Sequence, residues 1–221
     1  MNICVIIPAF NEAKNIANII KRIKSYNLKV LVIDDGSVDN TAEIALNSDV
    51  EVIKNKRNLG KGASLIRGFD YALKNNFDAV ITMDADGQHL PEDLPKFIQK
   101  AEQSNNSIFI GNRMLNPLKM PLIRKLTNRV MSFLISLIIK QNVPDTQCGF
   151  KLIKRELLEK LKLNTKHYDT ESEIIIKSAL LGYTIESIPI RCVYESKKSQ
   201  INPIVDTFRF IWFLIKIKIR L

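Results

Sequence analysis

Cysteine is scarce in this chain of 221 residues, which has only three, and no two of them form a CxxC pair. We therefore expect neither a disulfide scaffold nor a zinc site built on cysteine. Glycine and proline are also few, at eight each, which excludes a collagen-like or low-complexity chain. With 46% hydrophobic and 25% charged residues, the composition is that of a globular protein with one large domain.

Long apolar runs are missing as well. The longest, residues 130–139, is interrupted by two serines, whereas a membrane-spanning helix needs roughly 20 apolar residues. The apolar N-terminus begins without a charged leader and stops at Pro8, which favours a first strand over a signal peptide. We expect no transmembrane segment.

Acidic residues are absent between Gln103 and Pro144, where six basic residues occur. Residues 103–221 carry 20 Lys and Arg against 9 Asp and Glu, whereas residues 1–102 carry 13 against 14. The second half is therefore suited to an anionic partner, such as nucleic acid, a phosphate-bearing substrate or an anionic membrane. Nucleic acid is disfavoured, because the basic region is rich in Ile, Leu and Phe and has no recognition motif.

Short β-branched runs alternate with helical periodicity, which is typical of an α/β fold with a mostly parallel sheet flanked by helices. The stretch around Gly149 is predicted to be irregular. Residues 1–200 are predicted to form one domain, and residues 201–221 a C-terminal amphipathic helix. The predicted strands are residues 3–7, 30–34, 51–54, 79–84, 107–110 and 184–193. The main predicted helices are residues 61–74, 92–103, 121–140, 156–161 and 171–181.

Acidic clusters follow two of the predicted strands. Asp34 and Asp35 close one strand, and Asp84 and Asp86 close another. Because the carboxyl ends of parallel strands share one edge, these carboxylates repel each other unless a cation or a donor-rich ligand lies between them. Asp84, Asp86 and the Gln88 amide are hard oxygen ligands suited to a divalent metal that bridges to phosphate. Capping of the following helices is the alternative interpretation.

Two nearby features are interpreted more plainly. Gly60-Lys61-Gly62 lacks the spacing of a P-loop and is typical of close packing between a helix and the sheet, with Lys61 a candidate neighbour of a nucleotide. His89 follows the second acidic cluster, and we interpret it as a polar residue that opens a loop rather than as a metal ligand.

Four sequence blocks occur in order along the chain: Pro8-Ala9-Phe10-Asn11-Glu12, Asp34-Asp35-Gly36-Ser37-Val38-Asp39-Asn40-Thr41, Asp84-Ala85-Asp86-Gly87-Gln88-His89 and Asp145-Thr146-Gln147-Cys148-Gly149-Phe150. Together they resemble the family 2 glycosyltransferases, which have the GT-A fold. The fourth block is similar to the branch of dolichol-phosphate mannose synthases and dolichyl-phosphate glucosyltransferases, and the resemblance covers residues 1–200.

The resemblance implies a site for a nucleotide sugar and a metal. Asp84, Asp86 and Gln88 match the positions that hold Mg²⁺ or Mn²⁺ on the diphosphate, where the metal stabilises the departing charge. Arg191 and residues 194–199 resemble the segment that closes over the diphosphate in this branch, with Lys198 or its neighbour Lys197 as the lysine. The residues implied in nucleotide-sugar binding are Pro8, Phe10, Glu12, Asp35, Asp84, Ala85, Asp86, Arg191 and Lys198.

The resemblance also implies an acceptor site, with Arg113 on the acceptor phosphate. Arg129 and Ser132, on the basic helix, are the further candidates, because two guanidinium groups hold a phosphate bidentately. A phosphate acceptor needs positioning more than deprotonation, since its second pKa is about 6. A hydroxyl acceptor needs a general base, and Asp145 is the candidate; its alternative role is to orient an arginine or fix the turn at Gly149. Asp86, Arg113 and Asp145 are therefore the candidate catalytic residues.

The expected protein is an inverting, metal-dependent hexosyltransferase. It would move a hexose from GDP-mannose or UDP-glucose to a polyprenyl phosphate, dolichyl or undecaprenyl, at the cytoplasmic face of the membrane. The alternative keeps the donor and uses a saccharide or other hydroxyl acceptor. Residues 124–140 and 208–221 combine apolar bulk with basic flanks, which is typical of helices at a membrane interface. We expect peripheral binding, directly or through a membrane partner; ordinary core helices with solvated charges are the alternative.

Overall fold

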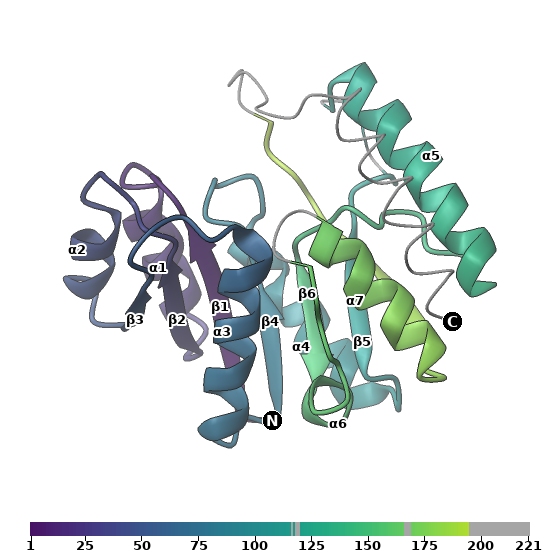
Figure 1. Cartoon of the computed structure of the whole chain (residues 1–221), viewed down its shortest axis with the longest axis horizontal. Helices are drawn as coiled ribbons and strands as arrows, with labels where there is room; N and C mark the ends of the chain where they lie inside the picture. The colour runs from purple at the N-terminus through teal and green to yellow at the C-terminus, as the bar shows by residue number, and fades with distance from the viewer. Residues whose placement is uncertain (116, 118–119, 166–168, 195–221) are drawn as a thin grey trace.

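Seven strands form one sheet in the order β3-β2-β1-β4-β6-β5-β7 (Figure 1). The computed structural model describes residues 1–115, 117, 120–165 and 169–194. The strands are β1 (Ile3–Ala9), β2 (Lys29–Asp34), β3 (Glu51–Lys54), β4 (Ala79–Thr82), β5 (Ile108–Asn112), β6 (Lys151–Lys154) and β7 (Ile185–Pro189). The helices are α1 (Ile16–Lys24), α2 (Thr41–Leu46), α3 (Lys61–Lys74), α4 (Leu94–Gln103, after a 3₁₀ turn at Pro91–Asp93), α5 (Leu122–Ile139), α6 (Arg155–Leu158) and α7 (Asp169–Leu180).

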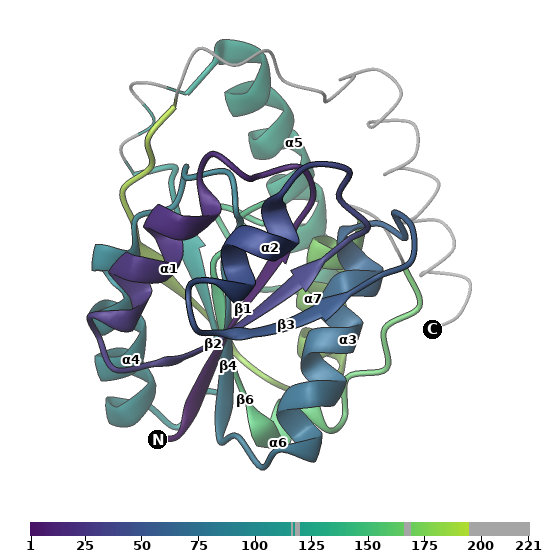
Figure 2. The ribbon, with the colours of Figure 1, turned by 90° about the vertical axis from the view of Figure 1, so that its left-hand side faces the viewer.

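Helices cover both faces of the sheet. Figure 2 shows α1 and α4 on one side and α3 and α7 on the other. The central strands β1 and β4 are buried almost throughout, as expected where a parallel sheet is covered on both faces. Four isoleucines of α1, spaced at helical intervals, turn one side of that helix into the core: Ile16, Ile19, Ile20 and Ile23. The strands and the buried helix faces thus form the core, and the loops at the strand ends carry the candidate functional residues.

Of the described strands, β6 alone runs antiparallel to both neighbours, and the sequence did not predict it. Lys151 is completely buried, in register with Thr82 of β4 and Ile110 of β5, and a lysine at a core position hides the apolar signal of a strand. Because β6 runs backwards, it begins at the edge where the parallel strands end. The block before it, residues 145–150, therefore enters the sheet at that edge, which we call the carboxyl edge.

Several predicted boundaries are corrected. The predicted strand 79–84 ends at Thr82, so Asp84 and Asp86 lie in the loop that follows. The predicted strand 184–193 ends at Pro189, and Arg191 lies beyond it. The predicted C-terminal helix and the domain boundary at residue 200 lie outside the described residues. Among the described helices, none combines the length and apolar character needed to cross a membrane.

Helix α5 lies beside α7, outside the helices that cover the sheet faces (Figure 1). The side chains that it buries are partly polar, since Asn128 and Ser132 lie among them with Met131 and Ile135. A polar strip on the buried face of a helix needs hydrogen-bond partners. Those partners belong to the site described below.

The contact between α3 and β1 leaves no room for a side chain at Gly68. A Cβ atom there would lie 2.5 Å from Cγ2 of Ile6, which is completely buried. We expect Gly68→Ala to lower the free energy of unfolding by about 1–3 kcal/mol through overpacking, although alanine favours helix by about 1 kcal/mol. Urea unfolding measures the change, and Asp70→Ala on the exposed side of α3 is the control. An unchanged unfolding midpoint in Gly68→Ala would contradict the close packing.

Candidate active site

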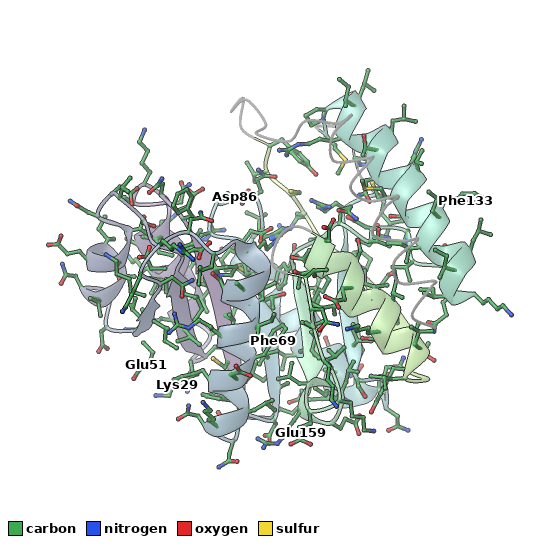
Figure 3. The ribbon with its side chains drawn as sticks, in the orientation of Figure 1. Lys29, Glu51, Phe69, Asp86, Phe133 and Glu159 are labelled. Atoms are coloured by element: carbon green, nitrogen blue, oxygen red, sulfur yellow. The ribbon has the colours of Figure 1, made fainter. Side chains whose placement is uncertain are left out.

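The candidate residues gather at the carboxyl edge of the sheet. The parallel strands β1, β2, β4, β5 and β7 end there, and the antiparallel β6 begins there. Figure 3 shows Asp86 at this edge and Glu159 at the opposite end of the sheet. Ligands of open α/β sheets bind outside the carboxyl ends of the strands, so this edge is the candidate active site.

Asp35, the predicted nucleoside ligand after β2, holds the loop that precedes α3. Its carboxylate accepts hydrogen bonds from the backbone N–H of Leu59 (2.9 Å) and Gly60 (2.8 Å) and from Nδ2 of Asn55 (2.7 Å). Only 3% of Asp35 is exposed. Its described partners are therefore protein groups, and they fix the point at which α3 begins with Lys61. A contact with the nucleoside stays a prediction.

The loops after β1 and β2 are joined by hydrogen bonds. The backbone N–H of Glu12 donates to Oγ1 of Thr41 at 2.8 Å. Phe10, between Pro8 and Glu12, has 43% of its surface exposed, so its ring is available to a ligand. The structure thus brings the first two sequence blocks together at the carboxyl edge.

Asp84 is held by a buried network of charges. It forms an ion pair with Lys61, whose ammonium also lies 2.7 Å from Oε1 of Glu171. The other oxygen of Glu171 pairs with Lys151, which also donates to the carbonyl of Cys148. Burial alone would raise the pKa of Asp84, but the charge and hydrogen bond of Lys61 act together with the other nearby cations, Lys151 among them, and lower it. Two lysines and two carboxylates are therefore neutralised together.

Sequence reasoning missed most of this network. Lys61 was expected only as a neighbour of a nucleotide. Lys151 and Glu171 carried no signal, because a lone lysine or glutamate in an amphipathic segment is typical of a solvated surface. A fully buried lysine opposite a nearly buried glutamate becomes visible only once β6 and α7 are placed.

Asp86 has no ion pair within the described part of the chain. Its Oδ1 accepts a hydrogen bond from the backbone N–H of Gln88 at 3.0 Å. Burial and, after it, the negative charge of Asp84 raise the pKa of Asp86. Ala85, which lies between these two residues in the sequence, is buried. A cation would relieve this repulsion.

The donor set fits Mg²⁺ or Mn²⁺ bound together with a phosphate. The described residues hold no group of three or more His, Cys, Asp and Glu side chains arranged for a metal ion. Asp84, Asp86 and the Gln88 amide offer three oxygen ligands from one loop. Mg²⁺ is commonly bound by one or two carboxylates, with substrate phosphates and water completing its coordination.

His89, expected as a polar residue that opens a loop, lies in the loop after β4 and is buried. Its Nδ1 lies 3.8 Å from Asp84, and its Nε2 lies 3.7 Å from the sulfur of Cys148. Burial lowers the pKa of His89 and raises the pKa of Cys148 to about 12. The pair is therefore a neutral imidazole beside a protonated thiol, which excludes a thiolate nucleophile here.

Gly149 brings the backbone close to Asp84. A Cβ atom at Gly149 would overlap both carboxylate oxygens of Asp84, and it would lie 2.6 Å from Oδ1. The Gly149 carbonyl accepts a hydrogen bond from Oγ1 of Thr82 at 2.7 Å, which fixes the peptide. The glycine of the fourth block thus leaves space for the acidic residue of the third.

Arg113 forms an ion pair with the buried Asp145. Asp145 accepts from Nε (2.8 Å), Nη2 (2.9 Å) and the backbone N–H (3.0 Å) of Arg113, and from Nδ2 of Asn128 (2.8 Å). Burial would raise the pKa of Asp145, but the hydrogen bonds and charge of Arg113, together with the hydrogen bond from Asn128, lower it. This geometry favours the orienting role of Asp145 over that of a general base.

The two other acceptor candidates are placed differently. Ser132 is buried, donates to Oδ1 of Asn128 (3.0 Å) and accepts from the backbone N–H of Thr146 (3.0 Å), so its hydroxyl supports the block around Asp145. Arg129 follows Asn128 and is exposed. Arg124 is half-buried and lies one turn before Asn128, on the same side of α5. Its helical spacing from Asn128 makes Arg124 a further candidate for contact with an acceptor phosphate, and the contact predicted for Arg129 stays a prediction.

The chain after β7 runs along the acidic loop. The backbone of Cys192 bridges to His89, and the N–H of Val193 donates to the Gln88 carbonyl at 3.0 Å. The Arg191 side chain is 63% exposed, with Nε 3.6 Å from Asp93. Lys198 lies outside the described residues, and its predicted contact with the diphosphate stays a prediction.

Acidic and basic loops at one edge of a mostly parallel sheet are typical of α/β enzymes that bind phosphorylated ligands. The chain belongs to glycosyl transferase family 2, whose model matches residues 4–162. The resemblance seen in the four sequence blocks is thereby confirmed.

Two relatives and one solved structure extend the comparison. A UDP-N-acetylglucosamine–dolichyl-phosphate N-acetylglucosaminyltransferase of Methanococcus voltae is 31% identical, over 98% of this chain and 96% of its own length. A dolichol-phosphate mannosyltransferase of Pyrococcus furiosus is 33% identical, over 80% of this chain and 53% of its own. Glucosyl-3-phosphoglycerate synthase of Mycobacterium tuberculosis, solved with Mn²⁺ and UDP, is 19% identical with a TM-score of 0.72, over 89% of this chain and 73% of that one. The structural likeness confirms the GT-A-like fold.

We expect Gly149→Ala to displace the Asp84 carboxylate, because the added Cβ atom overlaps it. The free energy of unfolding should fall by about 1–3 kcal/mol, since Asp84 and Lys61 lose their pairing geometry. Chemical unfolding measures the loss, and a crystal structure of the variant shows the carboxylate. Gly87→Asn, in the loop that carries Asp84, is the control, because asparagine tolerates the positive φ of 78° there. An Asp84 that stays paired with Lys61 in Gly149→Ala would contradict the prediction.

Proposed function

We propose that the protein transfers a sugar from a nucleotide sugar to a polyprenyl phosphate. The observation that carries the proposal is the partly exposed Arg113, held by the buried Asp145 at the carboxyl edge beside the loop of Asp84 and Asp86. The printed names of the relatives from Methanococcus voltae and Pyrococcus furiosus, both dolichyl-phosphate glycosyltransferases, support this acceptor.

The donor side is assigned to the acidic loop. Asp84, Asp86 and Gln88 would hold Mg²⁺ or Mn²⁺, and the metal would stabilise the charge that develops on the departing diphosphate. The loops of Pro8, Phe10, Glu12 and Asp35 would bind the nucleoside. GDP-mannose and UDP-glucose are the predicted donors, and the relative from Methanococcus voltae adds UDP-N-acetylglucosamine.

The acceptor side is assigned to Arg113. The Arg113 guanidinium has five N–H donors, and Asp145 accepts from two of them, which leaves three for a phosphate. Arg124, half-buried on the same side of α5 as Asn128, is a better second guanidinium than the exposed Arg129. An oxygen of the acceptor phosphate attacks the anomeric carbon, the bond to the diphosphate breaks, and the configuration inverts.

This acceptor needs no general base. A phosphate monoester is mostly dianionic at neutral pH because its second pKa is about 6. The alternative, a hydroxyl acceptor activated by Asp145, is weaker, because the Asp145 carboxylate already accepts four hydrogen bonds. We therefore place Asp145 as a positioning residue for Arg113.

Release of nucleotide tests the proposal directly. GDP-mannose, UDP-glucose and UDP-N-acetylglucosamine are each incubated with the protein, with Mg²⁺, Mn²⁺ or EDTA, and with polyprenyl phosphate, polyprenol or no lipid. We expect release from one donor that requires both metal and polyprenyl phosphate. Release stimulated equally by the uncharged polyprenol, or by a saccharide, would support the hydroxyl acceptor instead.

We expect Arg113→Lys to reduce lipid-dependent turnover at least about a hundredfold, because lysine cannot form the bidentate pair with Asp145 and bind a phosphate at the same time. Donor binding in the presence of Mn²⁺, measured by calorimetry, should change little. Arg129→Lys is the matched control and should keep most of its turnover. Equal losses in both variants would contradict the assignment.

The exposed side of α5 supports a place at a membrane surface. Phe133 lies on the side of this helix away from the sheet (Figure 3). Basic residues accompany the apolar ones, and no acidic residue occurs between residues 103 and 144. Apolar side chains with basic neighbours on one helix are typical of interfacial binding to anionic lipid. We call these exposed side chains the α5 apolar surface: Leu122, Ile123, Leu126, Val130, Phe133 and Leu137, each 48–82% exposed.

We expect Leu126→Ser combined with Phe133→Ser to weaken binding to vesicles of anionic phospholipid about tenfold or more, since each lost apolar contact contributes roughly 1–2 kcal/mol. Co-sedimentation with vesicles measures the loss. Leu46→Ser on α2, which removes a leucine that is 58% exposed, is the control and should bind as the wild type does. Unchanged binding of the double variant would exclude α5 as the contact.

A further inference from the structure

A lysine lies where the proposed site would receive a cation. The ammonium of Lys61 pairs with Oδ1 of Asp84 and lies 2.7 Å from Oε1 of Glu171. Lys61 is the first residue of α3, and the hydrogen bonds that the Asp35 carboxylate accepts from the backbone N–H of Leu59 and Gly60 fix the turn before it. The fold therefore sets the backbone position from which the Lys61 side chain reaches Asp84 and Glu171.

The two carboxylates that share Lys61 differ in what else surrounds them. Glu171 has a second cation, the buried Lys151, and its side chain is only 5% exposed. Asp84 is 28% exposed, and its close titratable neighbours include the buried His89, 3.8 Å away, and the carboxylate of Asp86, whose pKa it raises. A cation from solvent therefore reaches Asp84 and not Glu171. If Lys61 leaves Asp84, Glu171 can keep it.

We propose that Lys61 is an internal counter-ion of Asp84 that a divalent metal displaces, and that Glu171 retains the released ammonium. The inference rests on the metal site of the proposed function. Because the ammonium and the metal compete for one carboxylate, Lys61 weakens metal binding to the protein alone. The negative charge of a nucleoside diphosphate would attract the released Lys61 ammonium in addition to Glu171. Metal and nucleotide would therefore each strengthen the binding of the other.

Manganese binding to the full-length protein tests the inference without any turnover. Free Mn²⁺ is measured by electron paramagnetic resonance, with no nucleotide and with GDP or UDP. We expect Lys61→Met to bind Mn²⁺ alone about tenfold more tightly or better than the wild type, because a competing unit charge is removed. The gain in Mn²⁺ affinity that the nucleotide produces should shrink. Lys61→Arg keeps the charge and should stay close to the wild type.

Glu171→Gln should act in the opposite direction. With Glu171 neutral, Lys61 has only Asp84 as its carboxylate, so Mn²⁺ binding to the protein alone should weaken severalfold. A network with a purely structural role would weaken Mn²⁺ binding in both variants. Thermal melting checks that each variant folds; if Glu171→Gln does not fold, the comparison of Lys61→Met with Lys61→Arg decides. Lys24→Met, which breaks an exposed ion pair with Asp49, is the control.

Failure of the inference differs from failure of the proposed function. If the wild type binds Mn²⁺ with nucleotide but Lys61→Met binds Mn²⁺ alone no more tightly than the wild type, only the inference is overturned. If the wild type binds no Mn²⁺ even with nucleotide, and Asp86→Asn behaves identically, the proposed metal site and the inference are both overturned.

Discussion

Burial of charge is the constraint on which the arrangement of this site depends. Removing a charged group from water costs several kcal/mol, so Lys151, which is completely buried, requires Glu171. Glu171 in turn shares Lys61 with Asp84. These residues come from β6, α7, α3 and the loop after β4, so the pairing ties four distant segments to one point at the carboxyl edge. A shift of any one segment would leave a buried charge without its partner.

The fourth sequence block connects this network with the acceptor side. Its first residue, Asp145, holds Arg113, while the Cys148 carbonyl accepts from Lys151. Gly149 leaves the space that Asp84 occupies. The six residues 145–150 thus lie against both Asp84 and Arg113. Because β6 is antiparallel, this block enters the sheet between β4 and β5 at the edge where both of those strands end.

The sequence predicted the edge but not the pairing across it. Acidic clusters after buried apolar runs located Asp35, Asp84 and Asp86, since local patterns mark the ends of strands. The partners of Asp84 could not be found in this way, because Lys61 and Glu171 are 110 positions apart and look like surface residues. The second guanidinium on α5 stays a prediction: Arg129 was predicted from its place on the basic helix one turn from Ser132, and the structure adds Arg124, one turn from Asn128, as a further candidate.

In the proposed function, the charges at the carboxyl edge explain why the donor diphosphate would need a metal ion and the acceptor phosphate would not. On the donor side, Lys61 and Lys151 balance Asp84 and Glu171, and Asp86 adds one negative charge. In the proposed function, a diphosphate would meet a net negative loop there, and a divalent cation would supply the attraction. On the proposed acceptor side, Asp145 holds Arg113 through two of the five N–H donors of the guanidinium group. The three other donors would bind a phosphate dianion directly, so the acceptor would need no metal.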